Sequence, residues 1–199
     1  PALFKVQADA PVSLLEALGL TVLTLDPDPR FPDGHFVEDA AVVSPEAAVI
    51  ARPGAPSRRG EVEAVAAVLA RFRRRHFIQA PGTLDGGDVM RVGDRFFIGL
   101  SRRTNTAGAD QLADILRSCG YAVTRVPVGD GLHLKSSVSH IGDGRLLVTD
   151  EFAGNRAFEA HEQIRLDVDE RRAANALLIN DRLIMPAGCP RTHDTLRRL

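Results

Sequence analysis

The stretch Gly87-Asp-Val-Met-Arg-Val-Gly-Asp-Arg-Phe-Phe-Ile-Gly-Leu100 carries the clearest structural signal in this sequence. Two runs rich in β-branched and aromatic residues flank a central Gly-Asp pair, which predicts a β-hairpin with a two-residue turn. Apolar residues then recur at helical spacing over about residues 106–119 and stop before Gly120, which predicts a helix with a glycine cap. Residues 122–126 predict a third strand.

The same order of strand, turn, strand, helix and strand recurs about every 40–50 residues, which is typical of a repeat architecture. An earlier copy has predicted strands over residues 36–44 and 47–52, and a helix over about 59–73 that ends in the basic run 71–75. Later copies comprise predicted strands over residues 137–141, 145–149, 163–168, 175–180 and 183–186, and a terminal helix. The helix of the copy that begins near residue 134 is weak.

Two further segments precede the first copy. Val12, Leu15 and Leu18 are spaced as on one face of a helix, and Gly19 would cap it. Residues 21–25 predict a short buried strand, and a proline-rich loop follows.

Polar residues recur in phase where the first strand of each copy begins. These positions are Glu38-Asp39, Gly87-Asp88, Lys135-Ser136 and Ala174-Asn175. In a ring of repeats they would converge on one central site. The alternative is that strand ends are simply polar.

Composition restricts the class of protein. With 199 residues, we expect a single domain over 1–199. The net charge of −1 indicates no nucleic-acid partner, and no apolar run approaches the ~18 residues of a membrane span. Cys119 and Cys189 form neither a disulfide framework nor a metal quartet, so we expect a reducing, cytoplasmic location.

Glu38 and Asp39 interrupt an otherwise apolar run with two carboxylates, and Asp33 lies just before this run. A carboxylate in a half-buried strand is unfavourable unless it meets a cation. Two interpretations stay open: recognition of a guanidinium ligand through paired N–H bonds, or a structural partner for an arginine.

Other charged residues also have two interpretations. Arg58 and Arg103 lie in loops where they either hold a carboxylate or carry solvated surface charge. His133, between two leucines, is suited to acid–base work or is a buried structural histidine. Asp85 precedes a Gly-Gly pair, which indicates a tight backbone or the close approach of another group.

The sequence predicts no metal and no cofactor. The histidines lack metal-ligand spacing with one another, and no phosphate-binding or dinucleotide fingerprint is present. Neither cysteine has the cationic neighbour or helix N-terminus that would activate a thiolate. The oligomeric state is not predicted.

Five segments together resemble one family, the dimethylarginine dimethylaminohydrolases, or dimethylargininases. They are Phe36-Val-Glu-Asp39, Arg52-Pro-Gly-Ala-Pro-Ser-Arg-Arg59, Leu84-Asp-Gly-Gly-Asp-Val89, Gly99-Leu-Ser-Arg-Arg-Thr-Asn105 and Leu132-His-Leu-Lys-Ser136. The resemblance runs in order over about residues 32–191. It implies an α/β fold of the pentein type, a five-bladed α/β propeller of strand–strand–helix–strand repeats, with one unit incomplete here.

The resemblance also implies a reaction and its residues. Nω-methylated arginine, a small-molecule substrate, would be hydrolysed to citrulline and a methylamine without a cofactor. A cysteine would be the nucleophile and a histidine the acid–base group. His133 matches that histidine, and Asp85 matches the acid that orients it. The substrate-binding positions matched are Asp33, Glu38, Asp39, Arg58 and Arg103.

The sequence departs from the family at the nucleophile, which lies near the family's C-terminus. Cys189 matches a different family position, so no nucleophile is assigned among these residues. We therefore expect a chain truncated at both ends, inactive as it stands. Two alternatives remain: an enzyme similar to arginine deiminase, and a non-catalytic binder of guanidino compounds.

Overall fold

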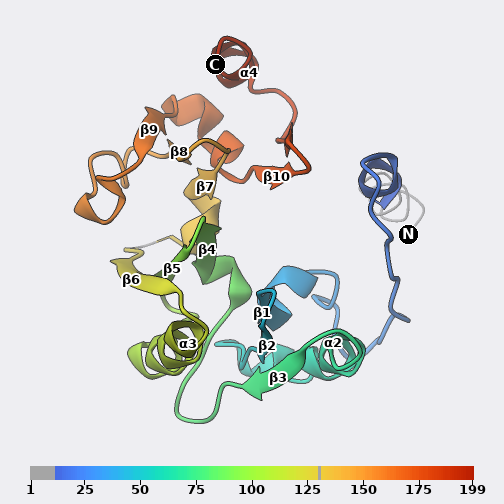
Figure 1. Ribbon diagram of the computed structural model, residues 1–199. Helices are drawn as coiled ribbons and strands as arrows, with labels where there is room; N and C mark the ends of the chain where they lie inside the picture. Colours follow the sequence, from blue (N-terminus) through green and yellow to red (C-terminus); the bar gives the residue numbers. More distant parts are fainter. Residues whose placement is uncertain (1–11, 130) are drawn as a thin grey trace.

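Four small β-sheets follow one another in chain order around the molecule in the computed structural model, which describes residues 12–129 and 131–199 (Figure 1). In each of the first three, two antiparallel strands form a hairpin and a third strand pairs parallel to the second. The fourth consists of one hairpin. The recurring unit expected from the sequence is therefore confirmed.

The strands, sheet by sheet, are β1 (Ala41–Val43), β2 (Ala47–Ile50) and β3 (Arg74–Phe77); β4 (Val89–Val92), β5 (Arg95–Leu100) and β6 (Ala122–Pro127); β7 (Val138–His140), β8 (Arg145–Val148) and β9 (Glu162–Arg165); and β10 (Leu177–Ile179) and β11 (Arg182–Ile184). The labelled α-helices are α2 (Val62–Leu69), α3 (Thr106–Ser118) and α4 (Pro190–Leu196), and residues 12–17 are also helical. The 3-10 helices are η1 (Val37–Ala40), η2 (Pro56–Arg58), η3 (Gly86–Asp88), η4 (Leu134–Ser136), η5 (Arg156–Phe158) and η6 (Val168–Ala174).

The β4–β5 unit agrees closely with its sequence pattern. Gly93 has φ +56°, the left-handed conformation that a tight hairpin turn requires and that glycine adopts without strain. Asn105 caps α3 by accepting a hydrogen bond from the Gly108 N–H, and the helix ends at the predicted position.

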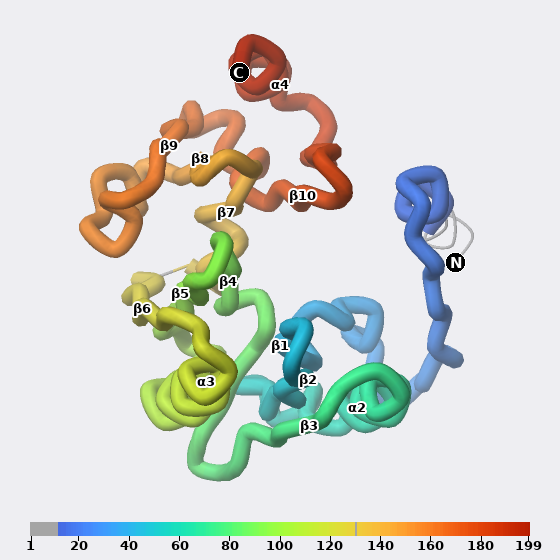
Figure 2. The backbone as a smooth tube through the Cα atoms, viewed as in Figure 1, coloured from blue at the N-terminus to red at the C-terminus, as the bar shows by residue number. Residues whose placement is uncertain are grey.

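Apolar side chains join each unit to the next. Strand β5 shows how, because alternate residues point to opposite faces: Phe96 packs in the cluster shared with the first sheet, and Phe97 in the cluster shared with the third. A third cluster, which includes Leu147 and Ala173, joins the third sheet to the segment before β10. The first strand of each unit lies toward the middle of the ring, and α2 and α3 lie outside (Figure 2).

A 3-10 helix precedes the first strand of each described unit, and in the first two units the sequence had predicted a longer strand there. Residues 36–44 thus divide into η1 and β1, with the Asp39 N–H bonded to the Phe36 carbonyl. In the same way η3 takes up the start of the strand predicted from Gly87, whereas η4 and η6 lie before the strands predicted over residues 137–141 and 175–180. The apolar pattern was misread as a continuous strand, because it cannot show where the backbone tightens into a turn.

Three other predictions were wrong. Residues 21–25 form no strand, because no described residue pairs with them in a sheet. Their side chains are exposed or half-buried, so the segment is not buried either. The basic run 71–75 does not end a helix: Arg74 and Arg75 begin β3, which pairs with β2. Between β8 and β9 the described chain forms only the short η5. Within residues 12–129 and 131–199, every helix is too short or too polar to cross a bilayer.

Candidate active site

A cavity of about 300 Å³ opens where the 3-10 helices of the four units meet. η1 contacts η3, η3 contacts η4, and η4 contacts η6. The cavity is lined by Asp33, Phe36, Glu38, Asp39, Arg58, Gly87, Arg103, Leu132, His133, Lys135, Ser136 and Asn175. The predicted convergence of the in-phase polar positions is confirmed.

Six of the seven residues singled out from the sequence line this cavity, and the seventh, Asp85, is fully buried. A carboxylate oxygen of Asp39, a carboxylate oxygen of Asp85 and a ring nitrogen of His133 all lie within 4.8 Å of one another. All seven residues therefore belong to one site or its immediate support, although their roles in a reaction stay predictions.

Asp39 and Arg58 form a buried ion pair at the wall of the cavity. The Arg58 Nη1 lies 2.8 Å from the Asp39 Oδ2, and its Nη2 lies 2.8 Å from Glu61 Oε2. Burial opposes the charge of Arg58, but its bonds to Glu61 and Asp39 outweigh burial and raise its pKa. Asp39 Oδ1 also accepts from the Gly87 N–H at 2.9 Å. Asp39 is thus fixed in place before any ligand binds.

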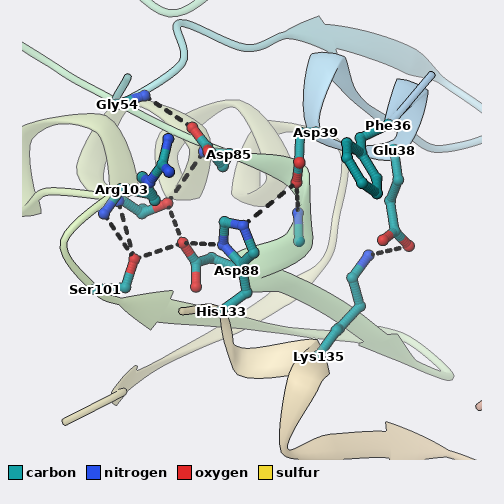
Figure 3. A network of polar contacts seen from close by, with 12 residues as sticks. Phe36, Glu38, Asp39, Gly54, Asp85, Asp88, Ser101, Arg103, His133 and Lys135 are labelled. Carbon is teal, nitrogen blue, oxygen red and sulfur yellow. Dashed lines mark hydrogen bonds and ion pairs between the residues drawn. The ribbon is translucent and has the colours of Figure 1, made fainter. Parts of the chain in front are cut away.

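His133 lies between carboxylates from two units (Figure 3). Its Nδ1 is 3.3 Å from Asp88 Oδ2, and its Nε2 is 3.9 Å from Asp39 Oδ1. Burial alone would lower the pKa of His133. The hydrogen bond to Asp88 and the negative charges of Asp88, Asp39 and Asp85 outweigh burial, so the pKa lies above its usual value.

Asp85 is the least satisfied charge in the site. Its Oδ1 accepts from the Gly54 N–H at 2.8 Å, whereas its buried Oδ2 has no hydrogen-bond partner in the described structure. Burial and the charge of Asp39 raise the pKa of Asp85 above its usual value, against the opposing effects of Gly54, His133 and Arg103. A buried, unpartnered carboxylate oxygen suits a ligand that brings its own N–H donors.

Two contacts in the site were not foreseen. The carboxylate at hydrogen-bonding distance from His133 is that of Asp88, and the predicted orienting role of Asp85 stays untested. Lys135 Nζ donates to Glu38 Oε1 at 2.7 Å across the cavity rim. Asp88 and Lys135 both belong to the in-phase polar positions, so periodicity identified them without indicating their partners.

The Gly86-Gly87 pair brings two units into close approach. A Cβ at residue 86 would lie 2.0 Å from the Glu38 carbonyl oxygen, and one at residue 87 would lie 2.8 Å from Asp39 Oδ1 and 2.9 Å from His133 Cγ. The close approach expected from the sequence is confirmed, and the approaching groups are η1 and the imidazole.

We expect Gly86→Ala to lower the free energy of unfolding by about 3 kcal/mol or more, because the clash is with backbone and cannot relax by a side-chain movement. Urea denaturation measures the effect. Gly131→Ala is the matched control, since its Cβ would meet only side-chain atoms at ordinary contact distances, Val128 Cγ1 at 3.4 Å and Ser137 Oγ at 4.0 Å. Similar losses in the two variants would contradict this reading.

The raised pKa of His133 also predicts a pH dependence of stability. The folded protein binds the imidazole proton more tightly than the unfolded chain does, so this contribution is complete below the ordinary value of about 6.5. It is lost as the pH rises through the folded pKa. We expect the free energy of unfolding to fall as the pH rises above about 6, and to fall less in His133→Gln. Parallel curves for the two proteins would refute it.

Two carboxylates and an imidazole could hold a divalent cation, and they equally fit a planar, multiply protonated nitrogen cation. Neither cysteine lines the cavity. Cys119 packs at the edge of the cluster around α3, and Cys189 is buried near α4. The cavity walls described here thus offer carboxylates and an imidazole without a thiol.

Comparisons with known proteins agree with this geometry. No family model matches the chain. A dimethylarginine dimethylaminohydrolase of Pseudomonas aeruginosa is 40% identical over 97% of this chain and 77% of its own length, and one of Streptomyces coelicolor is 40% identical over 97% and 74%.

A solved structure from Pseudomonas aeruginosa, a mutant of that enzyme complexed with citrulline, superposes with a TM-score of 0.94 at 40% identity. The match covers 96% of this chain and 76% of that one. The architecture is therefore the pentein-type α/β fold that the resemblance implied. The two relatives at 40% identity and the matching structure agree with the fold and with the carboxylates around the cavity, and they show that the chain belongs to the dimethylarginine dimethylaminohydrolase family.

Proposed function

We propose that this protein hydrolyses Nω-methylated arginines, asymmetric dimethylarginine and monomethylarginine, to citrulline and a methylamine. The observation that carries the proposal is the buried triangle of Asp39, Asp85 and His133 in a central cavity of a chain from this family. The triangle is negatively charged and preorganised, as a binding site for a guanidinium should be.

The residues divide naturally between the two ends of such a substrate. Asp39, with Asp85 and Glu38 nearby, would hold the guanidinium through charge-assisted hydrogen bonds. Arg103 and Arg58, with Asp33, would hold the amino-acid end. Arg103 supports this role because its buried Nη1 has no hydrogen-bond partner in the described structure. Arg58 already has two carboxylate partners, so its contribution would be indirect.

The proposed reaction has two steps. A cysteine thiolate attacks the guanidinium carbon, and as the carbon–nitrogen bond breaks, His133 protonates the departing methylamine. His133 then takes a proton from water, whose oxygen attacks the carbon, releases the thiolate and leaves citrulline. Neither Cys119 nor Cys189 supplies this thiolate, because neither lines the cavity. Because both are free thiols, we place the reaction in the cytoplasm.

Among residues 12–129 and 131–199 no thiol lines the cavity, which favours a second candidate, a protein that binds guanidino compounds without turning them over. Citrulline release by the full-length protein from asymmetric dimethylarginine, monomethylarginine and arginine separates the candidates, with calorimetric titration of each ligand alongside. Release from the methylated substrates supports hydrolysis. Preferential release from arginine would indicate a deiminase, binding without release would indicate the binder, and neither binding nor release would overturn both.

A further inference from the structure

Asp88 is the most completely hydrogen-bonded carboxylate next to His133. It is fully buried at the end of η3, and the sequence placed it among the in-phase polar positions but assigned it no role in the reaction. Its Oδ2 accepts from the hydroxyls of Ser101 and Thr104, both at 2.7 Å, and its Oδ1 accepts from the Leu134 N–H at 3.0 Å. The His133 Nδ1 completes the set at 3.3 Å.

The directions of the two hydroxyl bonds are determined by their other partners. Ser101 Oγ accepts from the backbone N–H groups of Arg103 and Thr104, at 3.0 and 3.2 Å. Thr104 Oγ1 accepts from the Asp85 N–H at 3.1 Å. Each hydroxyl has a single proton, and Asp88 is the acceptor that remains for it. Asp88 therefore accepts hydrogen bonds at both oxygens.

This arrangement determines the proton position on the imidazole. Because the Asp88 oxygen that faces the ring is an acceptor, the His133 nitrogen next to it must donate, so the neutral ring has its proton on Nδ1. Nε2 then has a free lone pair, on the side of Asp39 and the cavity. A base that takes a proton from a thiol or water and returns it to the leaving amine needs this tautomer.

We propose that Asp88 is a positioning residue for the hydrolysis proposed above: it holds His133 with the proton on Nδ1 and Nε2 open to the cavity. The inference rests on that proposed function. The hydroxyls of Ser101 and Thr104 donate to Asp88 and so keep it an acceptor. The turn that holds these hydroxyls also contains Arg103, so the same turn positions the imidazole and a cationic side chain of the cavity wall (Figure 3). Asp85, whose Oδ2 is unpartnered, is left free for the substrate.

The test compares Asp88→Asn with Asp85→Asn, two neutralisations of buried aspartates on either side of the Gly-Gly pair. An asparagine at 88 cannot replace the carboxylate, because in either orientation its NH₂ faces a donor, Leu134 N–H or the two hydroxyls. The imidazole tautomer is read from ¹⁵N NMR of the full-length protein without substrate, at a pH above the titration of His133.

We expect the Nδ1–H tautomer to predominate in the wild type and in Asp85→Asn, and to be lost in Asp88→Asn. We also expect the kcat of Asp88→Asn for citrulline release to fall about a hundredfold with little change in KM. An Nε2–H tautomer in the wild type would overturn the inference even if Asp88→Asn fails to fold. Loss of the Nδ1–H form in Asp85→Asn alone would assign the role to Asp85.

The two proposals fail separately. Because the tautomer is measured without substrate, the expected tautomer in a wild-type protein that releases no citrulline would overturn the hydrolysis and leave the Asp88–His133 geometry standing. Citrulline release by a wild type with the opposite tautomer would do the reverse.

Discussion

Replacing His133 by glutamine is expected to lower the kcat for citrulline release from asymmetric dimethylarginine by about 10²- to 10⁴-fold. The amide keeps the size and polarity of the side chain but cannot exchange a proton near neutral pH, so protonation of the leaving amine loses its donor. Steady-state kinetics of the full-length protein measures the change.

Binding should survive this substitution, because Asp39, which we expect to hold the guanidinium, keeps its own partners, Arg58 and the Gly87 N–H. His140→Gln is the control: His140 is a half-buried histidine on β7 that does not line the cavity. Equal losses in the two variants would show a general structural effect. An unchanged kcat in His133→Gln would remove the histidine from the reaction.

Asp39→Asn is expected to lower the free energy of unfolding by about 3 kcal/mol, since it removes one partner of a buried ion pair and leaves Arg58 less compensated. Binding of asymmetric dimethylarginine should weaken by about a hundredfold as well, because a charge-assisted contact to the guanidinium is lost. Urea denaturation and calorimetric titration measure the two effects separately.

Glu38→Gln is the matched control for stability. The Glu38–Lys135 pair is just as short, at 2.7 Å, but the Glu38 side chain is 60% exposed, and exposed pairs contribute about 1 kcal/mol or less. If Asp39→Asn is no more destabilising than Glu38→Gln, burial does not strengthen the Asp39–Arg58 pair. Unchanged binding of asymmetric dimethylarginine in Asp39→Asn would show that Asp39 does not hold the guanidinium.

Local pattern predicted the parts of the fold that local interactions hold. The β4–β5 hairpin and α3 appeared where glycine turns, alternation and capping placed them. Failures occurred where a distant partner decides the outcome. Residues 21–25 have a strand-like composition, yet a strand requires a neighbour to bond with, and none of the described residues pairs with them. The positive charges of Arg74 and Arg75 are typical of a helix end, and only the pairing with β2 makes these residues part of a strand.

The candidate site divides in the same way. Phase along the repeat identified Glu38-Asp39, Gly87-Asp88, Lys135-Ser136 and Asn175 as residues that would converge, and the resemblance named His133 and Asp85. Neither could indicate that His133 bonds to Asp88, 45 residues away. Nor could they show that Arg58 is buried against Asp39 rather than free for a ligand.

The sequence by itself determined the repeating unit, the family, and the charged residues that each unit places before its first strand, because spacing along the chain encodes these features. Only the tertiary structure decided which of those charges are paired, which oxygen is left unpartnered and which carboxylate faces the imidazole. The physical reason is that hydrogen bonds and burial depend on distances across units, which side-chain packing sets and chain order does not.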